Sequence, residues 1–569
     1  MTTKEYMTID GIPVELNGER NLLELIEKVG IKLPTFCYHS ELSVYGACRM
    51  CMVETESGGL EAACSTPPRA GMSIKTNTER LRRYRRNILE LLLANHCRDC
   101  TTCENNGSCK LQSLAMRFHI DGVRFPDGSN VTNTNARDIS SPCITRDASK
   151  CILCGDCVRM CNEIQNVGAI DFAHRGSKML ISTAFGVPIS QSPCVGCGQC
   201  AAVCPTGAIV VKNDMSPVWA ALDDPNVKTT VQIAPAVRVA VGRELGMKNG
   251  ENDMGRIVAA LRRMGFDEVY DTSLGADLTV IEESEEFLSR LEDSEKLPLI
   301  TSCCPAWVQY CEKKHPELMA NVSTCRSPMQ MFASLLREQA KTSSRRMFHV
   351  AVMPCTAKKF EAARDEFRTE GAPNVDAVIT TQELIRMIKE SGVIFDKLEP
   401  EAVDMPFGTV SGAGMIFGVT GGVTEAVLRR VAPDKSRTGL RLLQNLGERG
   451  SEGIKEFSLP YGDAELKIAV VSGLNHAEEV LARVKQGEHF DLIEVMACPG
   501  GCVSGGGQPF ASASLREERV TGLYTADRVS SIRRSEENPL IMSLYEGLLR
   551  GRVHELLHVK YNKIGGDTQ

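Results

Sequence analysis

The chain has 569 residues, of which 43% are hydrophobic and 24% are charged, and its formal net charge is −7. This composition is typical of a soluble globular protein with several domains, and it excludes a disordered, collagen-like or coiled-coil chain. The net negative charge, without a basic block, argues against a surface for nucleic acid. No apolar run approaches the roughly 18 residues that a membrane-spanning helix needs.

The chain contains 24 cysteines, and 17 of them lie in the first 205 residues. The opening segment MTTKEYMTIDGIPVEL is polar and mixed in charge, so we do not expect a signal peptide. A cysteine-rich chain without an export signal is expected in the cytoplasm, where thiols bind metals or carry out chemistry rather than form disulfides. The distribution predicts a metal-dense N-terminal arm followed by a larger C-terminal body.

The patterns along the chain predict a multidomain α/β and α+β protein. Short alternating runs flank one helical stretch at the start, as in a β-grasp-like domain, and a helix over residues 79–98 carries His96 near its end. From about residue 216, long helical patterns alternate with the strand-like segments VQIAP, LTVIE, FHVAVMP and KIAVVSGL, which predicts a two-lobed α/β body. The predicted domains are residues 1–78, 79–120, 138–215 and 216–510, followed by a helical tail over 511–569.

Two runs of four cysteines share one spacing, Cys-x2-Cys-x2-Cys-x3-Cys. This is the spacing of a bacterial ferredoxin with two [4Fe-4S] clusters, in which the fourth cysteine of each run ligates the other cluster. A structural zinc site needs only four ligands and leaves the doubled pattern unexplained. We therefore expect one cluster on Cys151, Cys154, Cys157 and Cys204, and a second on Cys194, Cys197, Cys200 and Cys161.

Two further groups of metal-binding residue types precede this repeat. A β-rich domain with four cysteines suits a [2Fe-2S] cluster, with zinc as the alternative, and the ligands would be Cys37, Cys48, Cys51 and Cys64. The second group has one imidazole and three thiolates: His96, Cys100, Cys103 and Cys109. Taken alone, this set favours zinc, but its place beside the other iron–sulfur sites favours a third accessory [4Fe-4S] cluster. Both groups resemble the front of the large iron–sulfur subunit of respiratory complex I.

Three segments of the C-terminal body carry unusual cysteine chemistry. They are TSCCPAW at 301–307, MPCTAKKFE at 353–361 and EVMACPGGCVSGGGQP at 494–509. Taken alone, they provide a [4Fe-4S] ligand set scattered along the chain, which predicts a cluster buried between two lobes. The glycines of the third segment allow the backbone to approach a bulky inorganic group and to present N–H donors to it.

These three segments resemble the signature motifs of [FeFe]-hydrogenases, and the resemblance covers essentially the whole chain. It implies an H-cluster, in which a [4Fe-4S] cubane on Cys304, Cys355, Cys498 and Cys502 is bridged by Cys502 to a diiron subcluster with CO, cyanide and azadithiolate ligands. Lys358 would donate a charge-assisted hydrogen bond to a cyanide ligand. The pocket residues implied are Ala234, Pro235, Met353, Phe417 and Met496, with Gln508 and Ser302 as lesser contacts.

The resemblance also implies a route for protons. Cys303 would be the thiol that exchanges protons with the bridging amine, and the route would continue through water, Glu283, Ser323 and Glu286 toward Arg290. Glu283 and Glu286 lie three apart, on one face of a helix. Without the resemblance, glutamates on a helix are expected to be solvated, as Glu285 is. The remaining thiols match no ligand pattern and are expected to be bystanders: Cys97, Cys143, Cys311 and Cys325.

One position departs from the family pattern. Members often have a glutamine after the Ser-Pro of this stretch, whereas Met329 follows Ser327-Pro328 here. The change removes a polar side chain near the expected pocket. All expected ligands and the proton-exchanging thiol are retained, so the assignment stands.

The resemblance implies a catalytic hydrogenase that interconverts H2 with protons and electrons. The complex I-like front end and the ending HELLHVKY resemble the catalytic subunit of multisubunit NAD(P)-linked, electron-bifurcating hydrogenases, whose flavin and nicotinamide sites lie in separate subunits. This chain has no GxGxxG fingerprint after a strand, which fits that division. Expected partners are therefore flavin- and NAD(P)-binding subunits, small iron–sulfur subunits, and ferredoxin.

Three alternatives stay open. A non-catalytic electron-transfer subunit would explain the N-terminal cysteines but not residues 301–509. An iron–sulfur assembly relative or a non-turnover H2 sensor tends to lose the proton-exchanging thiol or the pocket lysine, and both Cys303 and Lys358 are present. A hydrogenase subunit within a CO2-reducing formate complex is the third alternative.

Overall fold

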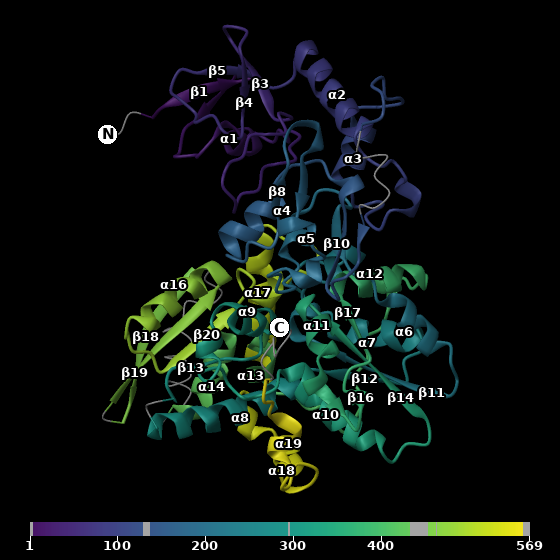
Figure 1. Ribbon diagram of the computed structural model, residues 1–569, viewed down its shortest axis with the longest axis vertical. Coiled ribbons are helices and arrows are strands. Elements are labelled where there is room, and N and C mark those ends of the chain that lie inside the picture. Colours follow the sequence, from purple (N-terminus) through teal and green to yellow (C-terminus); the bar gives the residue numbers. More distant parts are fainter. Residues whose placement is uncertain (1–3, 129–136, 294–295, 433–452, 463, 562–569) are drawn as a thin grey trace. The chain divides into compact units, whose positions relative to one another are not determined.

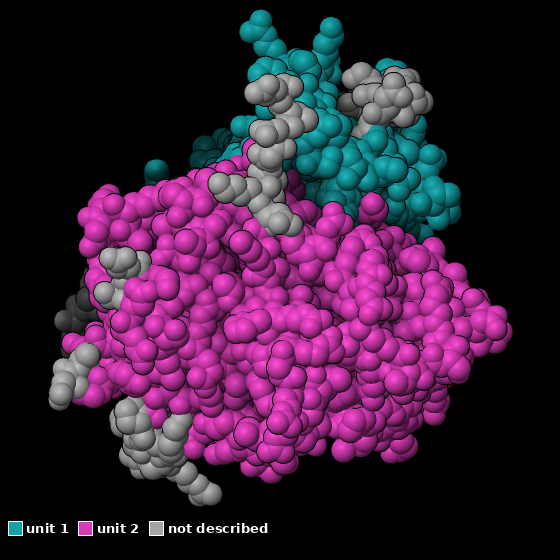
Figure 2. All heavy atoms as spheres, turned by 60° about the horizontal axis from the view of Figure 1, so that its bottom comes forward, with its two compact units in different colours: residues 1–164, 168–192, 203–210 teal, residues 165–167, 193–202, 211–569 magenta. Residues whose placement is uncertain are grey.

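The computed structural model describes residues 4–128, 137–293, 296–432, 453–462 and 464–561. The chain divides into two compact units, which Figure 2 colours separately. Unit 1 comprises residues 1–164, 168–192 and 203–210, and unit 2 comprises 165–167, 193–202 and 211–569. The segment 138–215, expected as one two-cluster domain, is therefore shared between the units. Within the described ranges, none of the helices combines the length and the hydrophobicity that a membrane crossing requires.

Unit 1 begins with a small mixed sheet around a buried apolar core. Its strand order is β2-β1-β5-β3-β4, with β1 parallel to β5 and antiparallel to β2. The strands are β1 Tyr6–Ile9, β2 Ile12–Glu15, β3 Met52–Thr55, β4 Leu60–Ala62 and β5 Ser73–Lys75. Helix α1, Leu22–Lys28, covers this core, and the Asn21 side chain caps it by accepting a hydrogen bond from the Glu24 N–H. The predicted β-rich first domain is thus observed.

The rest of unit 1 consists of short elements that hold cysteines on turns. Helix α2 spans Glu79–Ala94 and is capped by the Thr78 side chain, so it ends just before His96. The other helices are α3 Lys110–Arg117 and α4 Asp156–Arg159; α5 Gln199–Val203 belongs to unit 2 up to residue 202. The short strands are β6 Arg137–Asp138, β7 Ile144–Asp147, β8 Asp171–Ala173, β9 Leu180–Ser182 and β10 Ile209–Val211.

Unit 2 is built on two separate four-stranded sheets (Figure 1). The first has the order β12-β11-β14-β17 and is wholly parallel. Its strands are β11 Val227–Ile233, β12 Glu268–Asp271, β14 Arg346–Met353 and β17 Ala377–Thr380. The second has the order β13-β20-β19-β18, in which only β18 is antiparallel. Its strands are β13 Leu299–Ile300, β18 Gly453–Tyr461, β19 Ala464–Ser472 and β20 Leu492–Met496.

Helices cover the faces of both sheets, as their apolar buried strands require. The helices of unit 2 are α6 Met215–Leu222, α7 Met254–Arg263, α8 Ser273–Glu292, α9 Pro305–Lys314, α10 Pro328–Ala340, α11 Ala357–Ala363, α12 Thr381–Glu390, α13 Gly412–Met415, α14 Gly422–Val431 and α16 Leu474–Lys485. A minor hairpin joins β15 Arg368–Thr369 to β16 Ala372–Pro373. The C-terminal tail forms α17 Ala513–Val529, α18 Pro539–Glu546 and α19 Val553–Leu557.

The prediction of a strand at LTVIE is wrong. This segment lies inside α8, which packs against α10, α13 and α14. Every residue from Ser273 to Ser284 is buried, so the helix has no polar face there. A helix buried all round lacks the 3.6-residue periodicity by which helices are recognised, and its apolar run imitates a buried strand.

Candidate functional site

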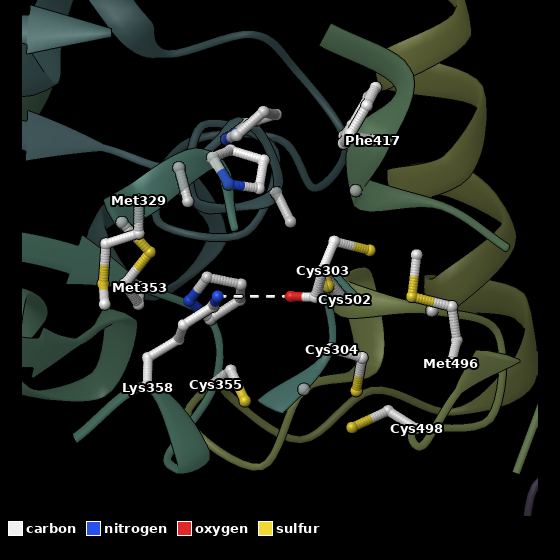
Figure 3. Close-up of a pocket in the computed structure, with 18 of the residues that line it drawn as sticks. Cys303, Cys304, Met329, Met353, Cys355, Lys358, Phe417, Met496, Cys498 and Cys502 are labelled. Atoms are coloured by element: carbon white, nitrogen blue, oxygen red, sulfur yellow. Dashed lines mark hydrogen bonds between the residues drawn. The ribbon is translucent and has the colours of Figure 1, made fainter. Parts of the chain in front are cut away.

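A single cavity of unit 2 collects the ends of strands from both sheets (Figure 3). Ala234 follows β11 and Cys355 follows β14 of the first sheet, whereas Cys303 follows β13 and Cys498 follows β20 of the second. The carboxyl ends of parallel strands are where α/β proteins place their ligands, because loops and helix N-termini converge there. Counted as the positions open to the centre of a water-sized sphere, the cavity has a volume of about 80 Å³.

The cavity brings together the four cysteines that were expected to ligate the cubane. Cys304 precedes α9 as its N-cap, Cys355 precedes α11, and the Cys498–Cys502 loop follows β20. Burial, reinforced by the neighbouring thiols, raises the pKa of the Cys355 thiol to about 12 and that of Cys498 well above its usual range. Such a group of buried thiols suits a metal group, whose positive charge would stabilise the thiolates. The donor set therefore fits a [4Fe-4S] cubane.

Lys358 extends from α11 into the same cavity (Figure 3). Its Nζ donates to the backbone oxygen of Cys303 at 3.2 Å and to Glu361 Oε2 at 2.8 Å. Burial disfavours the ammonium, but the Glu361 carboxylate outweighs that effect and raises the pKa of Lys358. An ammonium has three N–H donors, so one is left for an anionic acceptor in the cavity. Ser327 donates to Glu361 at 3.0 Å and fixes the carboxylate.

The rest of the cavity wall is mostly apolar. All five predicted pocket residues line it: Ala234, Pro235, Met353, Phe417 and Met496. Met329 also lines it, so the departure from the family pattern does place an apolar side chain at the cavity. Gln508 and Ser302 lie behind the wall: Gln508 donates to the Ala236 oxygen at 2.9 Å, and Ser302 donates to the Cys325 oxygen at 2.6 Å. An apolar wall keeps water away and strengthens the few polar contacts inside.

Glu283 is a buried carboxylate on α8 near Cys303. It is 0% exposed, and neither oxygen has a hydrogen-bond partner among the described residues. Burial, together with Glu286 and Glu494, raises the pKa of Glu283 to about 8. The thiol of Cys303 is buried as well, and burial followed by the charge of Glu283 raises its pKa well above the usual range. Both groups therefore hold a proton near neutral pH.

Ser323 and Glu286 continue from Glu283 toward the surface. Ser323 Oγ donates to Glu286 Oε2 at 2.8 Å, and Arg290 donates to Glu286 Oε1 at 2.6 Å. Glu286 is only half-buried, in contrast to Glu283. Glu285 on the same helix faces away and pairs with Arg430, as expected of a solvated residue. Ser323 and Arg290 are thus both hydrogen-bonded to Glu286, and Glu283 lies close to Glu286 and to Cys303.

The first N-terminal group of cysteines lies together in the β-rich part of unit 1. Cys37 lies beside Cys48, and Cys51 beside Cys64, in hydrogen-bonding thiol pairs. The backbone N–H of Phe36 points at Cys48 Sγ at 3.4 Å. Paired thiols with N–H donors aimed at sulfur fit a [2Fe-2S] cluster, whose sulfurs accept such bonds.

His96 shares a surface cavity of unit 1 with Cys100 and Cys109. It is buried, and its Nδ1 has no partner among the described residues. Burial, followed by the charge of Lys150, lowers the pKa of His96 to about 4, so the imidazole stays neutral. A neutral imidazole with one nitrogen free of partners, beside thiols, is suited to bind a metal, which fits both candidates for this group.

The cysteines of the ferredoxin-like repeat are divided between the two units. Cys151, Cys154, Cys157 and Cys204 line one cavity of unit 1, so the fourth cysteine of the second run joins the first three of the other. In unit 2, Cys197 lies near Cys194 and Cys200, and also near Cys498 of the main cavity. Cys161, the expected fourth ligand of that cluster, belongs to unit 1.

Glycines of the third cysteine motif allow its loop to pack closely against neighbouring backbone. A Cβ on Gly506 would lie 2.4 Å from the Cys197 oxygen, and one on Gly505 would lie 2.2 Å from the Pro354 oxygen. The glycines of PGGCVSGGGQP therefore allow backbone to pack on backbone, in addition to lining the cavity at Gly501 and Gly505. This packing holds the Cys498–Cys502 loop against the Cys194–Cys200 segment.

The bystander thiols have ordinary surroundings, with one exception. Cys97 donates to Asp99, and Cys311 donates to the His315 oxygen. Cys143 is buried. Cys325 lies 3.7 Å from Glu286 Oε2, next to the route from Glu283. Sequence spacing gives no sign of this contact, because Cys325 and Glu286 lie on different elements.

Comparisons with known proteins agree with this site. Residues 227–506 match the iron only hydrogenase large subunit, C-terminal domain, and residues 513–564 match the iron hydrogenase small subunit. Ahead of them lie a 2Fe-2S iron-sulfur cluster binding domain at 6–79, the NADH-ubiquinone oxidoreductase-G iron-sulfur binding region at 85–124 and a 4Fe-4S dicluster domain at 150–208.

Full-length relatives share this arrangement. The chain is 42% identical to NADP-reducing hydrogenase subunit HndD of Solidesulfovibrio fructosivorans, over 98% of each chain. It is 34% identical to Iron hydrogenase 1 of Clostridium pasteurianum, over 98% of this chain and 99% of that one. An apo structure of [FeFe]-hydrogenase HydA1 from Chlamydomonas reinhardtii matches at 36% identity and a TM-score of 0.53, covering 62% of this chain and 99% of that chain. With its cavity of four cysteines and relatives of this identity over its whole length, the chain belongs to the iron-only hydrogenase family.

Proposed function

We propose that the protein catalyses the reversible conversion of H2 into two protons and two electrons. One observation carries this proposal: a single apolar cavity holds four cysteine ligands, a further thiol with a line of proton carriers, and a lysine with a spare N–H. When bound, an H-cluster would supply the redox chemistry on hydrogen. Cys304, Cys355, Cys498 and Cys502 would hold its cubane, with Cys502 shared with the diiron part.

The chain's own residues would move the proton. The Cys303 thiol, which burial keeps protonated, stands at the inner end, where it would act as the general acid and base. Glu283 is the next proton carrier, because an unpaired buried carboxyl with a pKa of about 8 takes up and releases protons near neutrality. Ser323 and Glu286 lead to Arg290 and solvent. Lys358 would bind an anionic ligand of the cluster and hold it in place.

The N-terminal cysteines would conduct electrons. The cluster on Cys194, Cys197 and Cys200 would be the first acceptor, because Cys197 lies near Cys498 within unit 2. We infer one [2Fe-2S] and three accessory [4Fe-4S] clusters in all. Because HndD is a subunit of an NADP-reducing hydrogenase, we further infer flavin- and NAD(P)-binding partner subunits and small iron–sulfur subunits, with ferredoxin as a second carrier.

The test is anaerobic H2 uptake with a viologen by the matured protein. The Cys303→Ala variant should lose nearly all activity, whereas Cys311→Ala, at a buried thiol outside the cavity, should keep it. Infrared bands of CO and cyanide on iron should appear in all three proteins, which shows that the cofactor is loaded. An inactive parent with those bands present would instead indicate an H2 sensor.

The acceptor requires a separate measurement. H2-dependent NADP⁺ reduction should need the partner subunits and should be absent with the isolated chain. A native enzyme purified as a lone chain that passes electrons only to ferredoxin would contradict the inferred complex.

A further inference from the structure

Three metal-binding side chains outside the described cavity converge beside the proton route. Glu286 lies on α8, Cys325 lies just before α10, and His558 follows α19. One ligand atom of each lies within 4.8 Å of those of the other two. Cys325 Sγ is 3.7 Å from Glu286 Oε2, which is close to the separation of two ligands on one metal ion. Residues far apart in the sequence thus form one compact donor set.

The backbone and a neighbouring carboxylate fix His558 in position. Residues around Cys325 and His558 pair as a short β-bridge, and the Arg326 side chain donates to the His558 oxygen at 2.8 Å. His558 Nε2 lies 2.9 Å from Glu282 Oε2, and Tyr545 donates to the other oxygen of Glu282. In metal-bound histidines, one ring nitrogen usually donates its N–H to a carboxylate. This hydrogen bond fixes the tautomer and makes the other ring nitrogen the ligand.

The second ring nitrogen faces the donor set. His558 Nδ1 lies 2.8 Å from Thr324 Oγ1, which in turn lies 3.3 Å from Glu286 Oε2. With Nε2–H directed at Glu282, the Nδ1 lone pair accepts from the Thr324 hydroxyl, and a metal ion would take the place of that hydroxyl hydrogen. Thr324 is exposed, and Glu286 and His558 are partly so, which gives an ion a path from solvent, whereas Cys325 is buried behind them.

The local charge is negative. Glu282 and Glu286 face this point from α8, beside Glu283, which holds a proton near neutral pH. Arg290 is the one cation that an ion pair ties to Glu286 among the described residues. A dication is therefore attracted. A thiolate, an imidazole and a carboxylate suit a borderline-soft ion such as Zn²⁺, whereas Mg²⁺ and Ca²⁺ prefer oxygen ligands alone.

We propose that Glu286, Cys325 and His558 bind one Zn²⁺ ion, and that the bound ion blocks the exit of protons from the active site. On binding, the Cys325 thiol releases its proton to solvent as the Zn–S bond forms, with no change of oxidation state. Glu286 then donates its oxygen to the metal and no longer accepts a proton from Ser323. The blocking effect rests on the proposed proton route through Glu286, whereas the binding site does not.

Binding is measured on the iron–sulfur-loaded protein after dialysis against zinc. The parent should hold one more zinc per chain than Cys325→Ser or His558→Gln. Two controls should bind as the parent does: Cys311→Ser, a buried thiol elsewhere, and His554→Gln, an exposed histidine whose ring lies 4.7 Å from that of His558. X-ray absorption at the zinc edge should show one sulfur at about 2.3 Å, with nitrogen and oxygen ligands.

Two results would overturn the site. One is equal zinc in the parent and in both site variants. The other is a zinc spectrum with several sulfur ligands, because it would place the ion in a vacant cluster site.

The blocking effect is measured as H2 uptake with a viologen, each protein being compared with its own zinc-free rate. Zinc should lower the rate of the parent at least tenfold, a chelator should restore it, and Cys325→Ser and His558→Gln should resist zinc. Zinc that binds at this site without slowing turnover would leave the site established, but it would overturn both the block and the place of Glu286 in the proton route.

Discussion

At the scale of single residues, Glu283 is a polar, ionisable side chain in a buried part of α8. A carboxyl that is 0% exposed and has no partner among the described residues is costly to keep charged, and its pKa of about 8 reflects that cost. In a structural role such a residue would be replaced by an apolar one at little loss. The proposed proton route would give it a role between Cys303 and Glu286 that an apolar residue could not serve.

The variant Glu283→Gln tests this role with little change of shape. An amide has no proton to exchange at neutral pH, so H2 uptake should fall by about 10²-fold or more, within the range for lost proton transfer. The control is Glu285→Gln, two positions along α8, where the side chain pairs with Arg430 at the surface and activity should stay within a factor of two or so. Equal activities of the two variants would remove Glu283 from the route.

Residues at the site differ in how far their sequence context reveals them. The cysteine spacings point to clusters because ligand geometry constrains neighbours within one turn. Glu361, which neutralises Lys358, had a weak local signal, since it lies three positions further along α11. His558 and Glu282 had none, because only the tertiary fold brings the tail to α8.

At the scale of elements, β14 contains a histidine whose charge state the sheet determines. His349 is fully buried, with Thr230 at one ring nitrogen and Gln232 at the other, each 2.8 Å away. The Gln232 amide nitrogen also donates to Met329, and its oxygen accepts from Thr272, so the amide points an N–H at His349. The ring nitrogen facing it must be an acceptor. Burial, followed by the charge of Arg337, lowers the pKa of His349 to about 3.

This histidine should make the stability of unit 2 depend on pH. Because its pKa is lower in the folded state than the ordinary 6.5, the unfolded chain takes up the extra proton, and stability is lost as pH falls from 6.5 toward 3. Between pH 7 and pH 5 the loss is about 2 kcal/mol. Thermal melts of the parent and of His349→Gln at both pH values measure it. The parent should lose a few degrees more than the variant, and parallel shifts would show that His349 is not the cause.

The sheets and most helices follow from sequence patterns, and the failure at α8 has a physical cause. Strands β11, β14 and β19 are apolar runs bounded by turn residues, and α7 and α16 are amphipathic, so periodicity identifies them. Helix α8 crosses the core of unit 2 and has neighbours on every side near Leu278. The helical periodicity of a sequence arises from the alternation of a buried face and an exposed polar face. A helix without an exposed face, such as this part of α8, cannot be recognised from periodicity.

At the scale of the whole molecule, the cysteine groups predict a metal content. The proposed clusters require about 18 iron atoms per chain before the diiron part is added and about 20 after it. Elemental analysis of protein prepared in chelator-treated buffers measures this. If the group at His96 holds zinc instead, the iron count falls by about four and one tightly held zinc appears.

A variant tests whether the group at His96 holds four of these iron atoms. Cys100→Ser should remove about four iron atoms and leave viologen-linked H2 uptake largely intact, because the cavity of unit 2 does not include this residue. An unchanged iron count in the variant would contradict a cluster at this group.

The loops that are proposed to ligate the cubane follow strands of two different sheets, and this has a consequence for how the protein is made. Cys304 follows a strand of one sheet, Cys355 follows a strand of the other, and nearly two hundred residues separate the first motif from the last. During synthesis, the ribosome therefore releases Cys498 and Cys502 long after Cys304. The cubane can be completed only when the chain is almost finished, and its insertion then joins two halves that have already formed their own cores. A cell that is short of cubanes would thus accumulate nearly complete chains whose two halves lack their common iron centre.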